Sequence, residues 1–305
     1  MTSILTNTAA MAALQTLRAI DDSMETTQGR VSSGLRVGEA ADNAAYWSIA
    51  TTMRSDNMAL SAVQDALGLG AAKVDTAYAA MESAIDVVKE IKAKVVAATE
   101  EGVDKAKIQE EIGQLQEQLM SIAESASFSG ENWVAGDAGA KSVVSGFVRA
   151  ADGTVSVKAT AYTLVATATG NLLFGGNGTG GIVTNSGILG TAGGATINVS
   201  VYALNITGFD TAEMAEALTL VEGALQAMTS AASELGSISM RIGLQEDFVS
   251  TLTDSIDSGI GRLVDADMNE ESTRLKALQT QQQLAIQSLS IANTSSENIL
   301  QLFRQ

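Results

Sequence analysis

Glycines with the spacing of a nucleotide-binding loop lie in the segment GNGTGG, residues 176–181. In the GxGxxG motif these glycines let a pyrophosphate approach the backbone at the start of a helix, so the motif needs a strand before it and a helix after it. No helical pattern follows residue 181. The segment is therefore interpreted as part of a surface loop over residues 172–194, and not as a cofactor site.

A second suggestive spacing is that of a calcium-binding loop. Asp265, Asp267 and Asn269 stand where the first ligands of such a loop would be. The loop also requires glycine at its sixth position and a bidentate glutamate at its twelfth. Glu270 and Lys276 occupy those positions here. The pattern therefore fails, we expect no metal site, and Asp265 or Asp267 is interpreted as a helix cap.

The composition argues against catalysis and against nucleic-acid binding. The 305 residues contain no histidine and no cysteine, which removes the commonest general base and the thiolate ligands of metals. The formal charge of −17 is opposite to the charge that binds phosphates. The acidic pairs Glu110-Glu111 and Glu270-Glu271 are interpreted as exposed helix faces. We expect no catalytic residue and no cofactor.

The two ends of the chain carry its strongest patterns, and the chain has no proline. Because proline inside a helix costs about 3 kcal/mol, its absence favours long uninterrupted helices. Ile4 and Met11 stand seven residues apart, as do Leu17, Met24 and Val31. Both ends are typical of amphipathic helices suited to coiled-coil packing. The C-terminal seam, with spacings of three and four, consists of Leu275, Leu278, Gln282, Ala285, Leu289, Ala292, Ser296, Ile299 and Phe303.

Between the ends, helical spacing continues over long stretches. One helix is expected over residues 44–98, and a second helix carrying residues 108–122 is expected to pack antiparallel to it. Asp210 and Glu213 form a capping pair at the start of a third, and residues 259–261, Gly-Ile-Gly, are expected to end it. Its apolar residues stand seven apart: Val221, Met228, Leu235, Ile242, Val249 and Ile256.

Residues 130–208 differ from the rest, with sixteen of the 28 glycines and only six charges. Residues 143–149 and 154–158 are expected to pair as a hairpin across the turn Ala-Asp-Gly at 151–153. Residues 197–202 are expected to form another strand. The predicted fold is mainly α, with long antiparallel helices from both chain ends forming a rod and a small β-rich domain inserted between them.

The terminal helices carry more apolar residues than a two-helix seam can bury. Leaving one leucine or isoleucine in water forgoes about 1.5–3 kcal/mol. Exposed apolar surface on this scale indicates a protein partner or a membrane. A helix that lies on a membrane would have a basic polar face. Residues 1–30 hold only Arg18 and Arg30, so a protein partner is favoured. The apolar residues off the C-terminal seam are Leu284, Ile286, Ile291, Leu300 and Leu302.

We therefore expect other copies of the chain as partners, and contacts that do not close on themselves build a helical filament. No segment reaches the roughly 18 apolar residues that cross a bilayer, and no secretory leader is visible, so the sequence alone suggests a soluble cytoplasmic protein. The expected contact residues are Ile4, Met11, Leu14, Leu17, Leu275, Leu278, Leu289, Ile291, Ile299, Leu302 and Phe303.

Ordered motifs along both ends resemble those of bacterial flagellins. Residues 32–37, SSGLRV, are similar to the family's SSGLRI segment, and its central residues are Ser33, Gly34, Leu35 and Arg36. Similar motifs follow at residues 41–45, 128–130, 235–241 and 264–293. The segment AYWSIA, residues 45–50, resembles the alphaproteobacterial, rhizobial type.

The resemblance implies a structural subunit that polymerises into the flagellar filament and is not an enzyme. It implies an inner domain of residues 1–44 and 262–305, a helical rod domain of 45–160 and 209–261 with the hairpin, and a variable outer domain of 161–208. Expected partners are like subunits, filament cap and junction proteins, and an export chaperone. Export through the flagellar type III apparatus replaces the cytoplasmic expectation with an extracellular one.

Departures from the family pattern affect packing and recognition. Tyr46 stands where the family commonly has glycine, and Met240 where it has asparagine. Residues 85–91 correspond to the motif LQRVREL, which an innate immune receptor reads in many flagellins. Val87 replaces its first arginine and is followed by Lys89 and Glu90. Because valine lacks the guanidinium fork, we expect weak activation of that receptor.

Two other functions remain open at this point. A hook–filament junction protein shares the terminal helices, although the SSGLR and C-terminal motifs disfavour it. A secreted adhesin or enzyme built on a coiled coil belongs to a different class. An adhesin would tolerate the loss of its ends, whereas a filament subunit would not.

Overall fold

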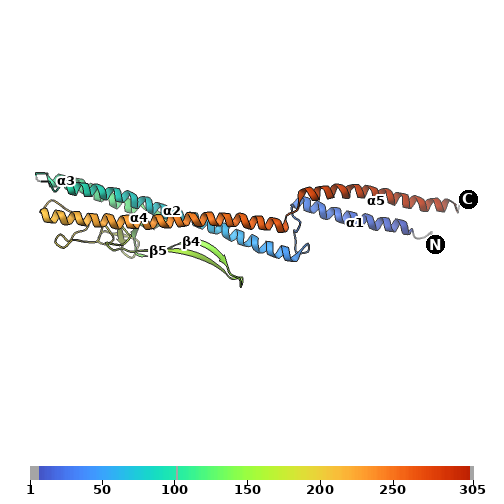
Figure 1. Ribbon diagram of the computed structural model, residues 1–305, viewed down its shortest axis with the longest axis horizontal. Helices are drawn as coiled ribbons and strands as arrows, with labels where there is room; N and C mark the ends of the chain where they lie inside the picture. The colour runs from blue at the N-terminus through green and yellow to red at the C-terminus, as the bar shows by residue number, and fades with distance from the viewer. Residues whose placement is uncertain (1–6, 101, 303–305) are drawn as a thin grey trace. The chain divides into compact units, whose positions relative to one another are not determined.

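The computed structural model describes residues 7–100 and 102–302, with side chains described for 7–100 and 102–294. Within these residues the chain forms long helices with a strand-containing region between them, which confirms the predicted mainly α class (Figure 1). The elements in chain order are α1 Thr8–Ser33, α2 Ala44–Ala97, α3 Lys105–Ser125, β1 Ser127–Phe128, β2 Glu131–Asn132, β3 Ala135–Gly136, β4 Gly139–Arg149, β5 Val155–Leu164, β6 Phe174–Gly176, β7 Ile182–Val183, α4 Thr211–Val264 and α5 Met268–Leu302.

The chain divides into two compact units. The terminal unit consists of the residues up to Met58 and from Asp254 onward, and the central unit consists of Ala59–Thr253. Helices α2 and α4 contribute residues to both units. The predicted division into inner, rod and outer domains stays a prediction.

In the terminal unit, α1 and α5 lie side by side and antiparallel (Figure 1). Asn7 Nδ2 donates to the carbonyl of Ala292 at 3.0 Å, and Gln282 Nε2 donates to Asp21 Oδ1 at 2.7 Å. The described residues of the predicted seam, from Leu275 to Ala292, are half-buried while most of their neighbours are exposed. This pattern confirms the predicted period.

Helix α4 ends later than predicted. It continues through residues 259–261 and ends at Val264. Two glycines cost about 1 kcal/mol each, but Ile260 and Val264 pack into a core with Val37 and Ala50, and that burial outweighs the cost. Helix α5 then begins at Met268, where Asp267 Oδ1 accepts the N–H of the residue two positions on at 2.9 Å. The interpretation of Asp267 as a cap is confirmed.

In the central unit, α2 and α4 run antiparallel. Ser239 Oγ donates to Asp75 Oδ1 at 2.8 Å, and Lys92 Nζ lies 2.6 Å from Glu222 Oε2. Helix α2 is continuous, as predicted. The heptad positions of α4 in this unit are all buried: Val221, Met228, Leu235, Ile242 and Val249.

The predicted capping pair begins α4. The N–H of Asp210 donates to Glu213 Oε2 at 2.9 Å, and the N–H of Glu213 donates to Asp210 Oδ1 at 2.7 Å. Both donors precede the regular hydrogen bonds of the helix, so the reciprocal pair fixes where α4 starts.

The predicted hairpin is present and longer than expected. Strands β4 and β5 pair antiparallel from Gly139↔Leu164 to Arg149↔Val155, with an irregularity between Val144 and Gly146. A Cβ on Gly70 of α2 would lie 2.1 Å from Val143 Cγ1. Glycine at position 70 therefore lets the hairpin pack directly on α2.

The strand predicted at residues 197–202 is wrong. Only an isolated bridge between Gly193 and Val199 forms there. Side chains of the neighbouring helices take the backbone groups that a strand partner would take. Glu216 accepts the N–H groups of residues 195–197, and Gln116 Nε2 donates to the carbonyl of Val201 at 3.0 Å.

The segment 172–194 was predicted as a surface loop, and this is only partly right. Leu172, Leu173 and Phe174 are fully buried, and so is Leu189. Strand β6 pairs in parallel with β3 and antiparallel with β7. A short apolar run therefore anchors a segment whose composition is otherwise that of a loop.

Candidate functional site

The described part of the chain offers no cluster of side chains of the kind that binds a metal ion. Its residues contain no group of three or more histidine, cysteine, aspartate or glutamate side chains that could hold a metal ion. The same residues include no helix long and apolar enough to cross a membrane. The first GxGxxG glycine, Gly176, ends β6, and the others lie between β6 and β7, so a strand, and not a helix, follows them.

The predicted contact residues fall into two groups on α1 and α5. Leu17, Leu275, Leu278 and Leu289 are half-buried, in keeping with the seam between the two helices. Met11 is 55%, Leu14 38% and Ile291 71% exposed. Ile4 and Phe303 lie outside the described residues, as do the side chains of Ile299 and Leu302.

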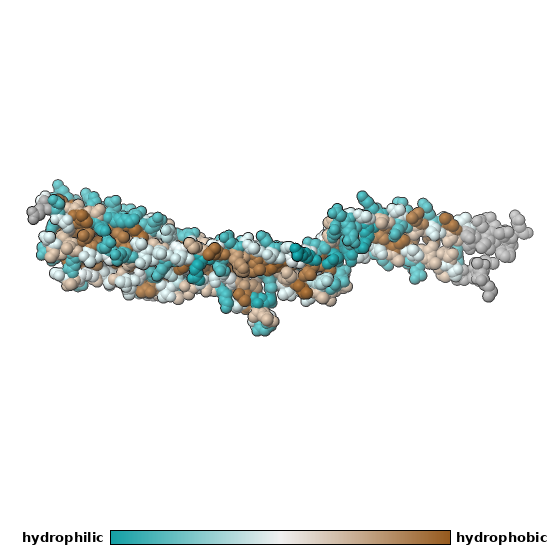
Figure 2. Space-filling view, viewed as in Figure 1, coloured by the Kyte–Doolittle hydropathy of each residue, from teal (hydrophilic) through white to brown (hydrophobic). Residues whose placement is uncertain are grey.

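The exposed group forms the apolar excess that the sequence indicates. Leu284 and Ile286 of α5 are 59% and 53% exposed, and Figure 2 shows apolar residues at the surface over α5. The α1–α5 pair alone therefore leaves several large apolar side chains in water. Burial of each would stabilise an assembly by a large part of the roughly 1.5–3 kcal/mol of a fully buried side chain.

A shallow groove of about 440 Å³ runs between α1 and α5. None of its lining side chains is charged, so an apolar helix face can enter it without desolvating an ion. The residues that line the groove are Ala13, Thr16, Ile20, Gln281, Leu284, Ala285 and Ser288.

The SSGLR motif joins the two halves of the terminal unit. Gly34 ends α1 with φ +73°, a left-handed conformation that glycine adopts readily. Its carbonyl accepts the N–H of Ala266 at 2.9 Å, and the N–H of Arg36 donates to the carbonyl of Val264 at 2.7 Å. The Arg36 guanidinium donates to the carbonyl of Leu263 at 3.1 Å.

The rest of the motif supports this junction. Ser33 Oγ accepts the N–H of Leu35 at 3.2 Å, and Leu35 packs against the core around Val264. Beyond the motif, Asp42 accepts the N–H groups of Gly38 and Glu39. These donors hold the pKa of the Asp42 carboxyl below its ordinary value. The motif residues thus fix the position of α1 relative to the end of α4.

Glu271 is buried, which corrects the interpretation of Glu270-Glu271 as an exposed pair. Its Oε1 lies 3.3 Å from Arg30 Nη1 of α1 and 3.5 Å from Arg274 Nη1 of its own helix. Only 5% of Glu271 is exposed. The sequence signal that could have indicated this is its place four residues before Leu275, which continues the α5 seam.

Sequence reasoning missed a second apolar surface in the central unit. Met240, Leu244 and Phe248 of α4 are 70%, 63% and 60% exposed. They stand four residues apart, beside the buried heptad positions, so they share one stripe of the helix. The spacing is present in the sequence, but the heptad series of α4 is the stronger pattern and was the one interpreted.

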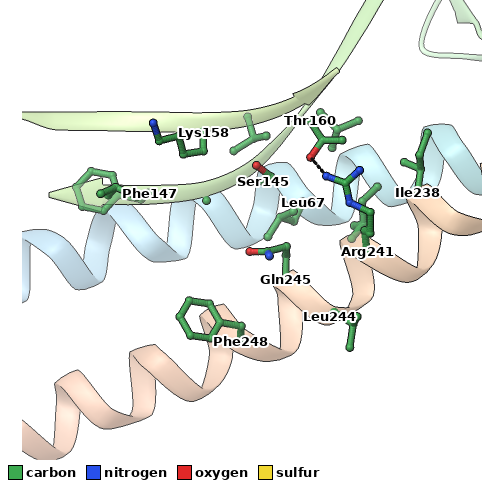
Figure 3. Close-up of a pocket in the computed structure, with 15 residues that line it drawn as sticks. Leu67, Ser145, Phe147, Lys158, Thr160, Ile238, Arg241, Leu244, Gln245 and Phe248 are labelled. Carbon is green, nitrogen blue, oxygen red and sulfur yellow. Dashed lines mark hydrogen bonds between the residues drawn. The ribbon is translucent and has the colours of Figure 1, made fainter. Parts of the chain in front are cut away.

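Next to this stripe, a groove of about 340 Å³ lies between the hairpin and α4 (Figure 3). Phe147 of the hairpin and Phe248 of α4 both line it. Arg241 donates to Thr160 Oγ1 at 3.2 Å across the groove. The central unit therefore also presents apolar side chains next to a cationic group.

The segment that corresponds to the receptor motif lies on α2. Val87, which replaces the first arginine, is 7% exposed and so belongs to the core. Lys89 and Glu90 are exposed, and Lys89 Nζ lies 2.9 Å from Asp86 Oδ1. The position of the arginine thus presents no polar group at the surface.

Comparison with known proteins identifies both ends of the chain. Residues 4–138 match the bacterial flagellin N-terminal helical region, and residues 218–303 match the bacterial flagellin C-terminal helical region. The unmatched segment between them, 139–217, contains the hairpin and strands β6 and β7.

Individual relatives match over their whole length. The chain is 56% identical to flagellin D of Rhizobium meliloti, 54% identical to flagellin B of the same species and 43% identical to a flagellin of Brucella melitensis, with all of each chain covered. The resemblance of the terminal motifs to flagellins is thereby confirmed. This chain belongs to the bacterial flagellins and is of the rhizobial type.

Proposed function

We propose that the chain is a structural subunit that polymerises into the bacterial flagellar filament. Its membership of the flagellin family over its full length supports this function. The location that follows is extracellular, in the filament. The single observation that carries the assembly mechanism is the row of exposed apolar side chains beside the α1–α5 seam.

The proposed contacts between copies involve α1 and α5. Met11 and Leu14 on α1 and Leu284 and Ile291 on α5 are exposed in the single chain, so another copy can cover them. The uncharged groove between the helices can accept an apolar helix face of that copy. Leu284 lines the groove itself, whereas Met11, Leu14 and Ile291 lie outside it. A face that carries these three residues can therefore enter the groove of the next copy, and such a heterologous contact can repeat without closing.

Deleting residues 296–305 tests this mechanism. The deletion removes the end of α5 and leaves the α1–α5 contacts from Asn7–Ala292 to Arg30–Glu271 in place. We expect the truncated chain to keep most of its helix by circular dichroism and to form no filaments by electron microscopy. Normal filaments from the truncated chain would refute the role of the terminal helices.

Membership of the flagellin family, and not a contact in the structure, supports the remaining proposed partners. They are filament cap and junction proteins, an export chaperone that holds the C-terminal helix before assembly, and the flagellar type III apparatus as the route of export. Co-purification with the chaperone from cells of the source type, lost when residues 268–305 are removed, would support the chaperone contact. Retention of the chaperone by the truncated chain would refute it.

Weak activation of the innate immune receptor is also proposed. The support is that Val87 is buried while only Lys89 and Glu90 of the three motif positions are exposed. A reporter-cell assay with the monomer is expected to show low potency. Full potency would refute this proposal without affecting the assembly mechanism.

A further inference from the structure

The loop between β6 and β7 contains the one Asn-Gly pair in the 305-residue sequence, Asn177-Gly178. In such a pair the backbone nitrogen of the second residue can attack the side-chain carbonyl carbon of the asparagine, and both groups are already held in one chain. Glycine hinders this approach least because it has no Cβ. Residues 177–180 are exposed, so water reaches the loop.

Asp137 contacts the nitrogen that would attack. The N–H of Gly178 donates to Asp137 Oδ1 at 2.6 Å, and the N–H of Gly180 donates to Asp137 Oδ2 at 3.2 Å. A carboxylate within hydrogen-bond distance of a proton is placed to accept it as a general base. Asp137 therefore draws electron density toward the Gly178 nitrogen and holds the loop beside β3.

Three donors surround the oxygen on which negative charge would develop. Asn177 Oδ1 accepts the N–H of Thr179 at 2.9 Å, the hydroxyl of Thr179 at 2.7 Å and the N–H of Gly181 at 2.9 Å. Donors fixed on a carbonyl oxygen stabilise the charge that forms there during nucleophilic attack. The electrophile is thus activated by groups of the β6–β7 loop, and the nucleophile is activated by Asp137, which follows β3.

We propose that Asn177 is a self-modification site, at which the Gly178 nitrogen displaces the side-chain amide with Asp137 as the base. The bond from Gly178 N to Asn177 Cγ forms, the Cγ–Nδ2 bond breaks, and Nδ2 leaves as ammonia with the proton that Gly178 loses through Asp137. Water then opens the five-membered succinimide at either carbonyl, which gives aspartate or isoaspartate. The reaction consumes one water, releases one ammonia and involves no oxidation or reduction.

The modification changes the charge of the loop. One new carboxylate makes the formal charge of the chain, −17, more negative by one. It stands in the β6–β7 loop, which Asp137 binds from its place directly after β3. The two carboxylates are expected to repel each other, since neighbouring like charges are unfavourable near a protein surface. Isoaspartate also lengthens the backbone between β6 and β7, so the loop is expected to loosen as it is modified.

Mass spectrometry of the purified full-length chain tests the proposal. After incubation at neutral pH and physiological temperature, the peptide with Asn177 is expected to change from amide to acid and to separate into aspartate and isoaspartate forms. Peptides with Asn185 and Asn198, which precede serine and valine, are internal references and should react more slowly, because the following residue has a Cβ that hinders the attack. A synthetic peptide of residues 174–183 gives the rate without the fold.

Substitutions distinguish the role of Asp137 as a base from its hydrogen bonds to the loop. Asp137→Asn keeps an oxygen that accepts from Gly178 but cannot serve as the base, so the rate is expected to fall by about a hundredfold. Asp152→Asn, in the exposed hairpin turn, is the matched control and should leave the rate unchanged. Asn177→Gln should abolish the reaction at this position.

The result that would overturn the site is an Asn177 that stays an amide as long as Asn185, or that reacts more slowly in the folded chain than in the peptide. In that case the hydrogen bonds protect the loop instead of activating it. An unchanged rate in Asp137→Asn would overturn the role of Asp137 as the base.

Discussion

Replacing Ile291 by alanine removes an apolar side chain that the single chain leaves 71% exposed. Full burial of an isoleucine is worth about 1.5–3 kcal/mol, so roughly 1–2 kcal/mol can be gained only when another chain covers the residue. Each 1.4 kcal/mol is about tenfold in an equilibrium constant. The substitution is therefore expected to raise the critical concentration for assembly by roughly 5- to 30-fold.

Light scattering and pelleting over a series of protein concentrations measure this change. The monomer itself should be unaffected, because exposed substitutions usually change stability by less than about 0.5 kcal/mol; circular dichroism under disassembling conditions checks that. Gln283→Ala, also exposed on α5, is the matched control and should assemble like the original chain. The reasoning is refuted if Ile291→Ala assembles at the original critical concentration, or if Gln283→Ala raises it equally.

Three further predictions concern the folded chain. Leu289→Asp puts a charge into the half-buried seam and is expected to abolish assembly and lower the melting temperature of the monomer by circular dichroism; an unchanged melting temperature would mean that Leu289 does not pack on α1. Gly34→Ala, at φ +73°, is expected to lower the free energy of unfolding by about 1–2 kcal/mol in urea titration. Gly29→Ala inside α1 should instead raise it by up to about 1 kcal/mol. Equal effects of the two substitutions would contradict the role of Gly34 as the C-cap of α1. Burial, and after it the negative charge of Glu234, raises the pKa of the Tyr162 phenol. The phenol of the unfolded chain ionises near pH 10, as a rough reference value, while the folded one keeps its proton. The free energy of unfolding is therefore retained below about pH 10 and falls as the pH rises above it. Tyr162→Phe should reduce this loss of stability at alkaline pH. An equal loss in the original chain and in the variant would contradict its assignment to Tyr162.

The long helices could be predicted because their apolar periods are strict. The α5 seam from Leu275 to Ala292 and the α4 heptads from Val221 to Val249 are buried or half-buried as the spacing indicates. The start of α4 could be placed because the Asp210–Glu213 pair is a local signal with its own hydrogen bonds. Period and capping are properties of neighbouring residues, so no tertiary information was needed.

The errors arose where tertiary contacts decide the local structure. Residues 259–261 suggest a helix end by their glycines, but the core around Val264 keeps them helical. Residues 197–202 alternate like a strand, yet Gln116 and Glu216 take their backbone hydrogen bonds. Val37 and Ala50 of that core, like Gln116 and Glu216, are far from these segments in sequence. The local pattern alone could therefore not indicate which secondary structure forms.

The exposure of apolar side chains could be predicted at the chain ends but not in the central unit. The surplus of apolar residues at the ends indicated an assembly surface, and Met11, Leu14 and Ile291 are indeed exposed in the single chain. The stripe from Met240 to Phe248 was not predicted, because its spacing shows that the three residues share one face of α4 but not that this face stays uncovered. Burial of Glu271 likewise depends on Arg30, which is 241 residues away.

Electron cryomicroscopy of filaments grown from the purified chain tests the central claim most directly. The account predicts that α1 and α5 of each subunit pack against neighbouring subunits, with Met11, Leu14, Leu284 and Ile291 buried at those contacts. A reconstruction in which these four side chains face solvent, while the subunits are joined by other surfaces, would contradict it.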